Sequence, residues 1–299
     1  MVSLKSRLFV LVLKLLGKKN DMKDAASLHA TIKKRRASSD YRPNAKIRAR
    51  LEIEEMEIGG FPAYVISPKG KTTTNTIFYL HGGAYVYEII PPHWTFIADF
   101  AHQANATIMV PIYPLAPEHT VEETLAFTEA AYTAFEARVG AGPIHLMGDS
   151  AGGGLGLALA QKRLAEGARL PANLFLISPW LDVALAGDDT ALCDAHDPWL
   201  AVGGLQEAGR LYADGLPVDD PRVSPLHGPV EGLPPCHIFI GTRDLLMPDC
   251  KRFMDKLTNA GQVMSYHQEP GMFHCWPLVN MPEAQRARAA IIRLMNGQP

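Results

Sequence analysis

The sequence contains few cysteines, and they form no recognisable pattern. Cys193, Cys236, Cys250 and Cys275 are the only ones in 299 residues, and they lie far apart, with no CxxC pair. No His/Cys spacing suits a tetrahedral metal site. We therefore expect ordinary thiols in a reducing, cytoplasmic compartment, and neither a disulfide scaffold nor a metal site.

An apolar run long enough to cross a membrane is also missing. Residues 8–16 are apolar, but they include Lys14 and fall well short of the roughly 20 residues that a helical span needs. No small-residue cleavage site follows them, so we expect no secretory signal.

The composition excludes a disordered or collagen-like chain, because 47% of the residues are hydrophobic and 20% are charged. An α/β domain commonly has about 250 residues, which leaves some 50 residues for an appendage. The length therefore predicts one domain with a cap.

Acidic residues are scarce in the first 50 residues. This segment has 14 Lys/Arg and 3 Asp/Glu, whereas the remainder has 15 and 28. A nucleic-acid arm, a membrane-surface segment or a basic cap on an acidic body would each explain the asymmetry. No aromatic residues interleave with the cationic residues 33–36, so we do not expect nucleic-acid binding.

The N-terminal segment predicts helices. Leucines and valines between residues 4 and 16 recur at helical spacing, and the pattern ends at Gly17. A second helix is expected over residues 21–32. We predict that residues 1–45 form a helical cap that acts as a lid; a cationic helix merely packed on the body is the alternative. Membrane-surface contact through the first helix and a homodimer are left open.

Residues 46–299 show the alternation of strands and helices that is typical of a mostly parallel α/β sheet flanked by helices. Strands are expected at residues 50–58, 63–67, 76–80, 107–111, 144–147, 173–177, 237–241 and 265–269. Helices are expected at residues 92–104, 121–139, 152–166, 200–213, 249–260 and 282–296. An insertion at about residues 182–235 shows no clear strand, and we expect it to contribute to the cap.

Residues 144–159 carry the most informative motif. An apolar strand runs into Gly148-Asp149-Ser150-Ala151-Gly152, followed by a helix rich in small residues. GxSxG in this setting forms a sharp turn that exposes a serine hydroxyl. We predict that Ser150 is a nucleophile.

A nucleophilic serine needs a base, and the base needs an orienting acid. After a turn of this kind, the acid and then the histidine follow on later strands. His274 lies five residues beyond an expected strand, and Asp244 lies three residues beyond another. We predict these two as base and acid, with Asp249 as the reserve acid.

The oxyanion that forms on attack needs hydrogen-bond donors. His81-Gly82-Gly83-Ala84-Tyr85 directly follows an expected strand, and consecutive glycines let backbone N–H groups converge. We expect the amides of Gly82, Gly83 and Ala151 to form this site.

With these motifs, the sequence resembles the hormone-sensitive-lipase-like (bacterial family IV) carboxylesterases. The resemblance covers most of residues 50–299 and includes the segment 113–119, Tyr-Pro-Leu-Ala-Pro-Glu-His. It implies an α/β-hydrolase fold with a helical cap and hydrolysis of short- to medium-chain esters, and it gives Ser150, His274 and Asp244 the roles above. The chain departs from the family at Ala84, where a third glycine is common, and at residues 120–121, where Phe-Pro often occurs.

The predicted function is that of a serine carboxylesterase that acts on a small-molecule ester without a metal or organic cofactor. An amidase, thioesterase or peptidase with the same triad is the alternative, as is a receptor of the same fold that has lost catalysis. A preference for long acyl chains would instead indicate a lipase. Aromatic residues that could line the substrate pocket are Tyr85, Trp94, Trp180 and Trp199.

Overall fold

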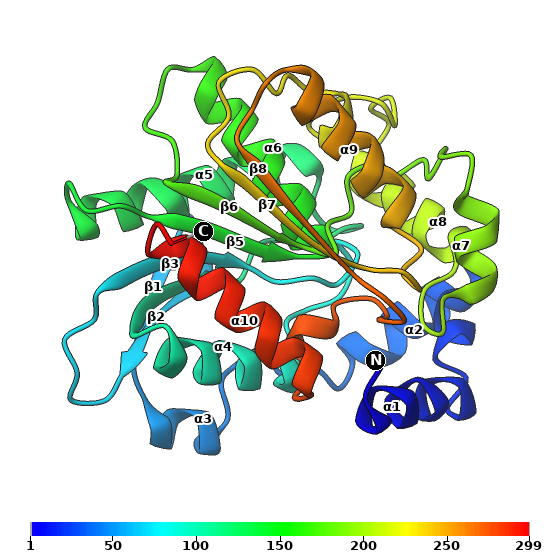
Figure 1. The fold of residues 1–299 in the computed structure, drawn as a ribbon, viewed down its shortest axis with the longest axis horizontal. Helices are drawn as coiled ribbons and strands as arrows, with labels where there is room; N and C mark the ends of the chain where they lie inside the picture. Colours follow the sequence, from blue (N-terminus) through cyan, green and yellow to red (C-terminus); the bar gives the residue numbers. More distant parts are fainter. Residues whose placement is uncertain (1, 299) are drawn as a thin grey trace.

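Eight strands form one sheet in the order β1-β2-β4-β3-β5-β6-β7-β8 (Figure 1). The computed structural model describes residues 2–298. β2 is antiparallel to β1 and β4, and the other neighbours are parallel. The strands are β1 (Leu51–Ile58), β2 (Phe61–Pro68), β3 (Asn75–Leu80), β4 (Ala106–Pro111), β5 (His145–Asp149), β6 (Asn173–Ile177), β7 (Cys236–Gly241) and β8 (Met264–Glu269). The predicted mostly parallel sheet is confirmed, since all eight expected strands are present.

Helices cover both faces of the sheet. α4 (Pro91–Gln103) and α10 (Pro282–Met295) lie on one face, whereas α5 (Val121–Val139), α6 (Ala151–Ala165) and α9 (Met247–Asn259) lie on the other (Figure 1). Each face has its own hydrophobic core, and the central strands β5 and β7 are buried along their whole length. Such continuous burial is typical of parallel strands between two helical layers.

A further group of helices lies beside the carboxyl ends of the central strands (Figure 1). The group consists of α1 (Leu4–Leu15), the short 3₁₀ helix η1 (Lys18–Met22), α2 (Ala25–Arg36), α7 (Thr190–His196) and α8 (Val202–Ala213). Gly204 of α8 lies so close to the N-terminal segment that a Cβ atom there would sit 2.1 Å from the carbonyl oxygen of Met22. The N-terminal segment and the insertion are therefore packed together.

Two short helices were not expected from the sequence. α3 (Ala45–Arg50) has six residues and is capped by Asn44, whose side chain accepts hydrogen bonds from the N–H groups of Lys46 and Ile47. α7 has seven residues. Neither is long enough to show an apolar repeat. The 3₁₀ helices η2 (Pro225–His227) and η3 (Trp276–Leu278) complete the structure.

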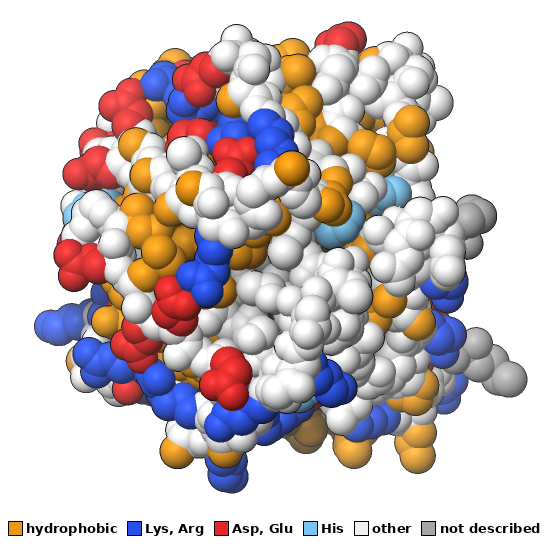
Figure 2. Space-filling model, turned by 90° about the vertical axis from the view of Figure 1, so that its left-hand side faces the viewer, with side chains coloured by type: hydrophobic (Ala, Val, Ile, Leu, Met, Phe, Trp, Pro, Cys, Tyr) orange, Lys and Arg blue, Asp and Glu red, His pale blue; other side chains and the backbone are white. Residues whose placement is uncertain are grey.

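No helix within residues 2–298 combines the length and the apolar character that a membrane span requires. On the face shown in Figure 2, acidic and basic side chains lie next to one another, with hydrophobic side chains between them. Few direct ion pairs join the basic N-terminal segment to the rest of the described chain. In the described chain, only Lys19–Asp194 and Arg36–Glu118 join a Lys or Arg of residues 1–45 to a later carboxylate.

Candidate active site

Ser150 lies in a strained turn between β5 and α6. Its φ of 53° and ψ of −121° are unusual for a residue with a side chain. Glycines on both sides allow the turn: a Cβ atom on Gly148 would lie 2.3 Å from the carbonyl oxygen of Gly152, and one on Gly152 would lie 2.1 Å from that of Leu80. The GxSxG segment thus adopts the turn that its sequence predicts.

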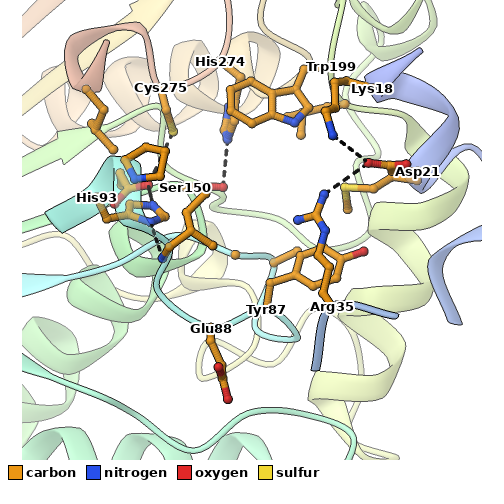
Figure 3. A pocket seen from close by; sticks show the side chains of 18 of the residues that line it. Lys18, Asp21, Arg35, Tyr87, Glu88, His93, Ser150, Trp199, His274 and Cys275 are labelled. Carbon is orange, nitrogen blue, oxygen red and sulfur yellow. Dashed lines mark hydrogen bonds and ion pairs between the residues drawn. The ribbon is translucent and has the colours of Figure 1, made fainter. Parts of the chain in front are cut away.

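The structure brings Ser150, His274 and Asp244 together from three loops (Figure 3 shows the first two). His274 Nε2 lies 2.9 Å from Ser150 Oγ, and His274 Nδ1 lies 3.1 Å from Asp244 Oδ2. Asp244 follows β7 and His274 follows β8, and all three side chains are buried. This arrangement can pass a proton from the serine hydroxyl to the imidazole.

The reserve acid, Asp249, lies elsewhere. It is in the first turn of α9, where its carboxylate accepts a hydrogen bond from Arg252 at 2.9 Å. Of the two predicted carboxylates, only Asp244 therefore contacts the imidazole.

Neighbouring charges shift the pKa of His274. Burial of the imidazole disfavours its charged form, but the charge and hydrogen bond of Asp244, with the charges of Asp197 and Asp149, outweigh burial. The pKa of His274 is therefore raised above its ordinary value of 6.5.

The expectation for Gly82 needs correction. Its backbone N–H donates to Asp149 Oδ1 at 3.0 Å, so this amide is already occupied. Among the described residues, the backbone N–H groups of Gly83, Ala84 and Ala151 have no such acceptor. The donors that remain for an oxyanion are therefore Gly83, Ala84 and Ala151, with Ala84 in place of Gly82.

Asp149 is a residue of the site to which the sequence analysis gave no role. Its buried carboxylate accepts hydrogen bonds from the Tyr79 hydroxyl at 2.5 Å and from the Gly82 amide, and it lies 3.4 Å from His93 Nε2. Burial raises the pKa of Asp149, but His93 and Tyr79 outweigh this effect, and the pKa is lowered overall. The role of Asp149 could have been predicted from its position, because a carboxylate at the end of a buried strand, directly before a nucleophile, needs hydrogen-bond donors around it.

A cavity of about 670 Å³ opens at Ser150 and His274. Figure 3 shows these two side chains on one side, with Lys18, Asp21 and Arg35 opposite. The N-terminal segment and the insertion both contribute to the walls. Some of the lining residues are Phe9, Met22, Tyr87, Trp199, Leu200, Leu205 and Val279.

The predicted aromatic residues have different positions relative to this cavity. Trp199 lines it, and its indole ring lies nearly perpendicular to the His274 ring, with 6.2 Å between the centroids. Tyr85 and Trp180 are not among the lining residues. They stack on each other in the core, and Tyr85 also stacks on Tyr212. Trp94 does not line the cavity either, because it is buried against Tyr64. Of these four aromatic residues, only Trp199 therefore lines the cavity.

Within residues 2–298, His, Cys, Asp and Glu side chains form no group of three that is placed to hold a metal ion.

Known proteins are similar to this chain in sequence and in fold. Residues 77–278 match a protein family described as alpha/beta hydrolase fold. An esterase from Acinetobacter venetianus is 32% identical over 248 residues, which are 81% of this chain and 80% of that protein. A crystal structure of an esterase from the bacterial hormone-sensitive lipase family superposes with a TM-score of 0.82 and 26% identity, and the match covers 100% of this chain and 99% of that one. The chain belongs to the hormone-sensitive-lipase-like family of α/β-hydrolases.

The chain is also similar to an acetyl-hydrolase from Streptomyces hygroscopicus. It is 31% identical over 229 residues, which are 75% of this chain and 77% of that protein. The family, the α/β-hydrolase fold and the enzyme class, a carboxylic ester hydrolase, are thus as the sequence predicts.

Proposed function

We propose that the protein hydrolyses short- to medium-chain carboxylic esters through an acyl-enzyme on Ser150. The observation that carries this proposal is the continuous hydrogen-bonded chain from Ser150 through His274 to Asp244, of which Ser150 and His274 line a cavity. A serine hydroxyl is a weak nucleophile at neutral pH, so it depends on such a chain.

In the first step, Ser150 Oγ attacks the ester carbonyl carbon and His274 Nε2 takes the hydroxyl proton. Asp244 holds the imidazole with Nδ1 protonated and stabilises the imidazolium. The N–H groups of Gly83, Ala84 and Ala151 donate to the carbonyl oxygen as it becomes negative. The imidazolium then protonates the leaving alcohol. A water molecule, deprotonated by His274, cleaves the acyl-enzyme and releases the acid.

The walls of the cavity favour an apolar acyl group of limited length. Met22, Leu200, Leu205 and Val279 contribute apolar side chains, and the volume of about 670 Å³ is within the range of small-molecule sites. The acetyl-hydrolase among the relatives is consistent with a short acyl group.

Turnover of matched substrates tests the reaction. We expect p-nitrophenyl butyrate to be hydrolysed much faster than the corresponding p-nitroanilide and thioester. Faster cleavage of the anilide or the thioester would instead indicate an amidase or a thioesterase. In a series from acetate to palmitate we expect the maximum at short to medium chains, whereas a maximum at palmitate would indicate a lipase.

We further propose that residues 1–45 and the insertion at about 182–235 act together as the cap over residues 46–299. Phe9 and Met22 from the first segment and Trp199 and Leu200 from the second line the same cavity. Deletion of residues 1–40 is expected to change both turnover and chain-length preference. An unchanged preference with unchanged turnover would contradict a lid function.

We propose that α1 also contacts a membrane surface. The helix packs on the body through Ser6, Val10 and Leu13, whereas a stripe of large apolar side chains faces outward. The stripe consists of Leu4, Leu8, Leu11, Val12 and Leu15, which are 41% to 82% exposed. Since packing on the body does not use this stripe, it is available for a partner.

Charge favours an anionic lipid bilayer as that partner. Residues 1–20 contain five Lys/Arg and no Asp/Glu. Lys5, Arg7 and Lys14 form no ion pair with any of residues 2–298, and at helical spacing they flank the apolar stripe on both sides. An apolar stripe with cations along its edges is typical of a helix that lies in a lipid interface.

The position of α1 would connect a bilayer with the reaction. Phe9 lines the cavity and stacks on Phe273, next to His274, with 4.8 Å between the ring centroids. A lipid surface bound to the outer side of α1 would therefore lie close to the cavity.

Sedimentation with vesicles tests this contact. We expect binding to phosphatidylglycerol/phosphatidylcholine vesicles, weaker binding to phosphatidylcholine alone, and at least a fivefold loss of affinity in a Leu8→Ser, Leu15→Ser double variant. Leu192→Ser, Val263→Ser is a matched control, because these side chains are 61% and 66% exposed elsewhere. Absence of vesicle binding would contradict the contact. A dimer that the α1 variant alone dissociates would show that the stripe binds a second copy instead.

We also propose a cytoplasmic location. All four cysteines are buried and form no disulfide in the described chain, which is consistent with a reducing compartment. Recovery of the protein from the medium rather than from the lysate of producing cells would contradict this location.

A further inference from the structure

Asp197 has a buried carboxylate that joins two separate parts of the active site. It follows α7 within the insertion and is only 2% exposed. Its Oδ1 atom accepts the backbone N–H groups of Trp199 at 2.7 Å and Leu200 at 2.8 Å. Its Oδ2 atom accepts the N–H of Leu245 at 2.8 Å. One side chain thus bridges two segments that are almost 50 residues apart in the sequence.

Both segments belong to the site. Trp199 and Leu200 line the cavity, and the Trp199 ring packs nearly perpendicular to the His274 ring. Leu245 directly follows Asp244, whose carboxylate contacts His274 Nδ1. A shift of either segment would alter how the imidazole is held.

The charge of Asp197 is placed to act on the same imidazole. Among the described residues no Lys or Arg forms an ion pair with this carboxylate; Lys19 reaches only its backbone oxygen, at 3.3 Å. Burial and the neighbouring charge of Asp244 raise the pKa of Asp197 to about 7, whereas His274 and the amide donors lower it. The acidic groups that act on His274 are Asp244, Asp197 and Asp149.

We propose that Asp197 is a positioning residue that fixes the cavity wall at Trp199 to the loop that carries Asp244, and that its carboxylate, whose ionised form is favoured by the imidazolium and by the amide donors, helps to stabilise the imidazolium of His274. The proposal rests on the proposed function, in which His274 is the base. It explains why a carboxylate occupies a buried position where all three partners are backbone N–H groups.

The test compares Asp197→Asn with wild type in ester hydrolysis. The amide oxygen can still accept from Trp199 and Leu200, but the amide NH₂ would face the N–H of Leu245. We expect kcat to fall about tenfold or more with a smaller change in KM, since a contact to the catalytic loop is lost. Without the negative charge the imidazolium is less favoured, so the acid limb of kcat/KM should move about 0.5 pH unit lower.

Two further variants separate positioning from stability. Asp182→Asn is the matched control, because Asp182 is equally buried in the same insertion but accepts from Ala184 and pairs with Arg252. Asp182→Asn should leave the acid limb of the kcat/KM profile unchanged. Asp197→Glu keeps the charge and should keep the wild-type acid limb while kcat falls. If Asp197→Asn does not fold, a wild-type kcat for Asp197→Glu contradicts the positioning role.

A folded Asp197→Asn variant with wild-type kcat and acid limb would overturn the proposal. A loss of activity with an unmoved acid limb and the same loss of stability as in Asp182→Asn would reduce Asp197 to a structural role. Failure of the proposed function is a different result, because wild type itself would then not hydrolyse esters or react with a fluorophosphonate.

Discussion

The carboxylate of Asp149 holds the backbone amide of Gly82 at 3.0 Å. This hydrogen bond connects the residue before the nucleophile with the glycine loop that follows β3. The same carboxylate also accepts the Tyr79 hydroxyl. It therefore holds the glycine loop next to the residue that precedes Ser150.

Removal of this anchor should slow catalysis. For Asp149→Ala we expect kcat to fall about 100-fold with little change in KM, which is comparable to the loss of one oxyanion donor. Tyr79→Phe is the control, because it removes one donor to Asp149 and leaves the hydrogen bond to Gly82. Its kcat should fall less than that of Asp149→Ala. Steady-state ester hydrolysis measures both. A folded Asp149→Ala enzyme with normal kcat would contradict the role of the anchor.

A methyl group on Gly83 should disrupt the oxyanion site. Its φ is +136°, and a Cβ atom would lie 2.3 Å from the carbonyl oxygen of Tyr87, so the loop has to move. We expect Gly83→Ala to lose at least 100-fold in kcat/KM. Gly60→Ala is the matched control, because Gly60 also has a positive φ, +86°, but open space around its Cβ position. Equal losses in both variants would show that backbone strain, not the oxyanion site, is responsible.

The pH dependence should follow the ionisation of His274. Its pKa is raised, so the imidazolium persists to higher pH than for a free histidine. Because the base has to be neutral, kcat/KM should fall as the pH decreases through a midpoint above 6.5. A pH–rate profile with a stable substrate measures this midpoint. A rate that stays flat down to pH 4 would rule out His274 as the base.

Two of the three tryptophans predicted at the pocket, Trp180 and Trp199, should respond differently to truncation. Trp180 is fully buried, so Trp180→Ala should lower the free energy of unfolding by about 3–5 kcal/mol. Trp199 lines the cavity, so Trp199→Ala should mainly change KM and chain-length preference. Denaturant unfolding and the acyl-chain series separate the effects. The assignment fails if Trp180→Ala alters chain preference and leaves stability unchanged.

Local sequence patterns predict the strands and the positions of Ser150, Asp244 and His274, because each depends on a short segment and on the order of the strands. The strain at Ser150 follows from the glycines of its own motif. Short helices such as α7 could not be predicted, because seven residues are too few to show an apolar repeat at helical spacing.

Long-range contacts explain what the sequence alone could not predict. A Gly-Gly pair does not reveal which amide already has an acceptor, and Gly82 is occupied only because Asp149 reaches it from β5. The sequence does not indicate whether an aromatic side chain near a site points into the core or into the cavity. Tyr85 packs on Tyr212 in the core, whereas Trp199 packs on His274 at the cavity. Asp197 contacts Leu245 only through the folding of the insertion.

The most direct test of the account is the covalent labelling of Ser150. The folded wild-type enzyme is treated with a fluorophosphonate, and peptide mass spectrometry locates the adduct while p-nitrophenyl butyrate hydrolysis is followed in parallel. We predict one adduct per chain, on Ser150, that forms at the rate at which hydrolysis is lost, and neither labelling nor hydrolysis in Ser150→Ala. A label on another residue, or ester hydrolysis retained by folded Ser150→Ala, would contradict the account.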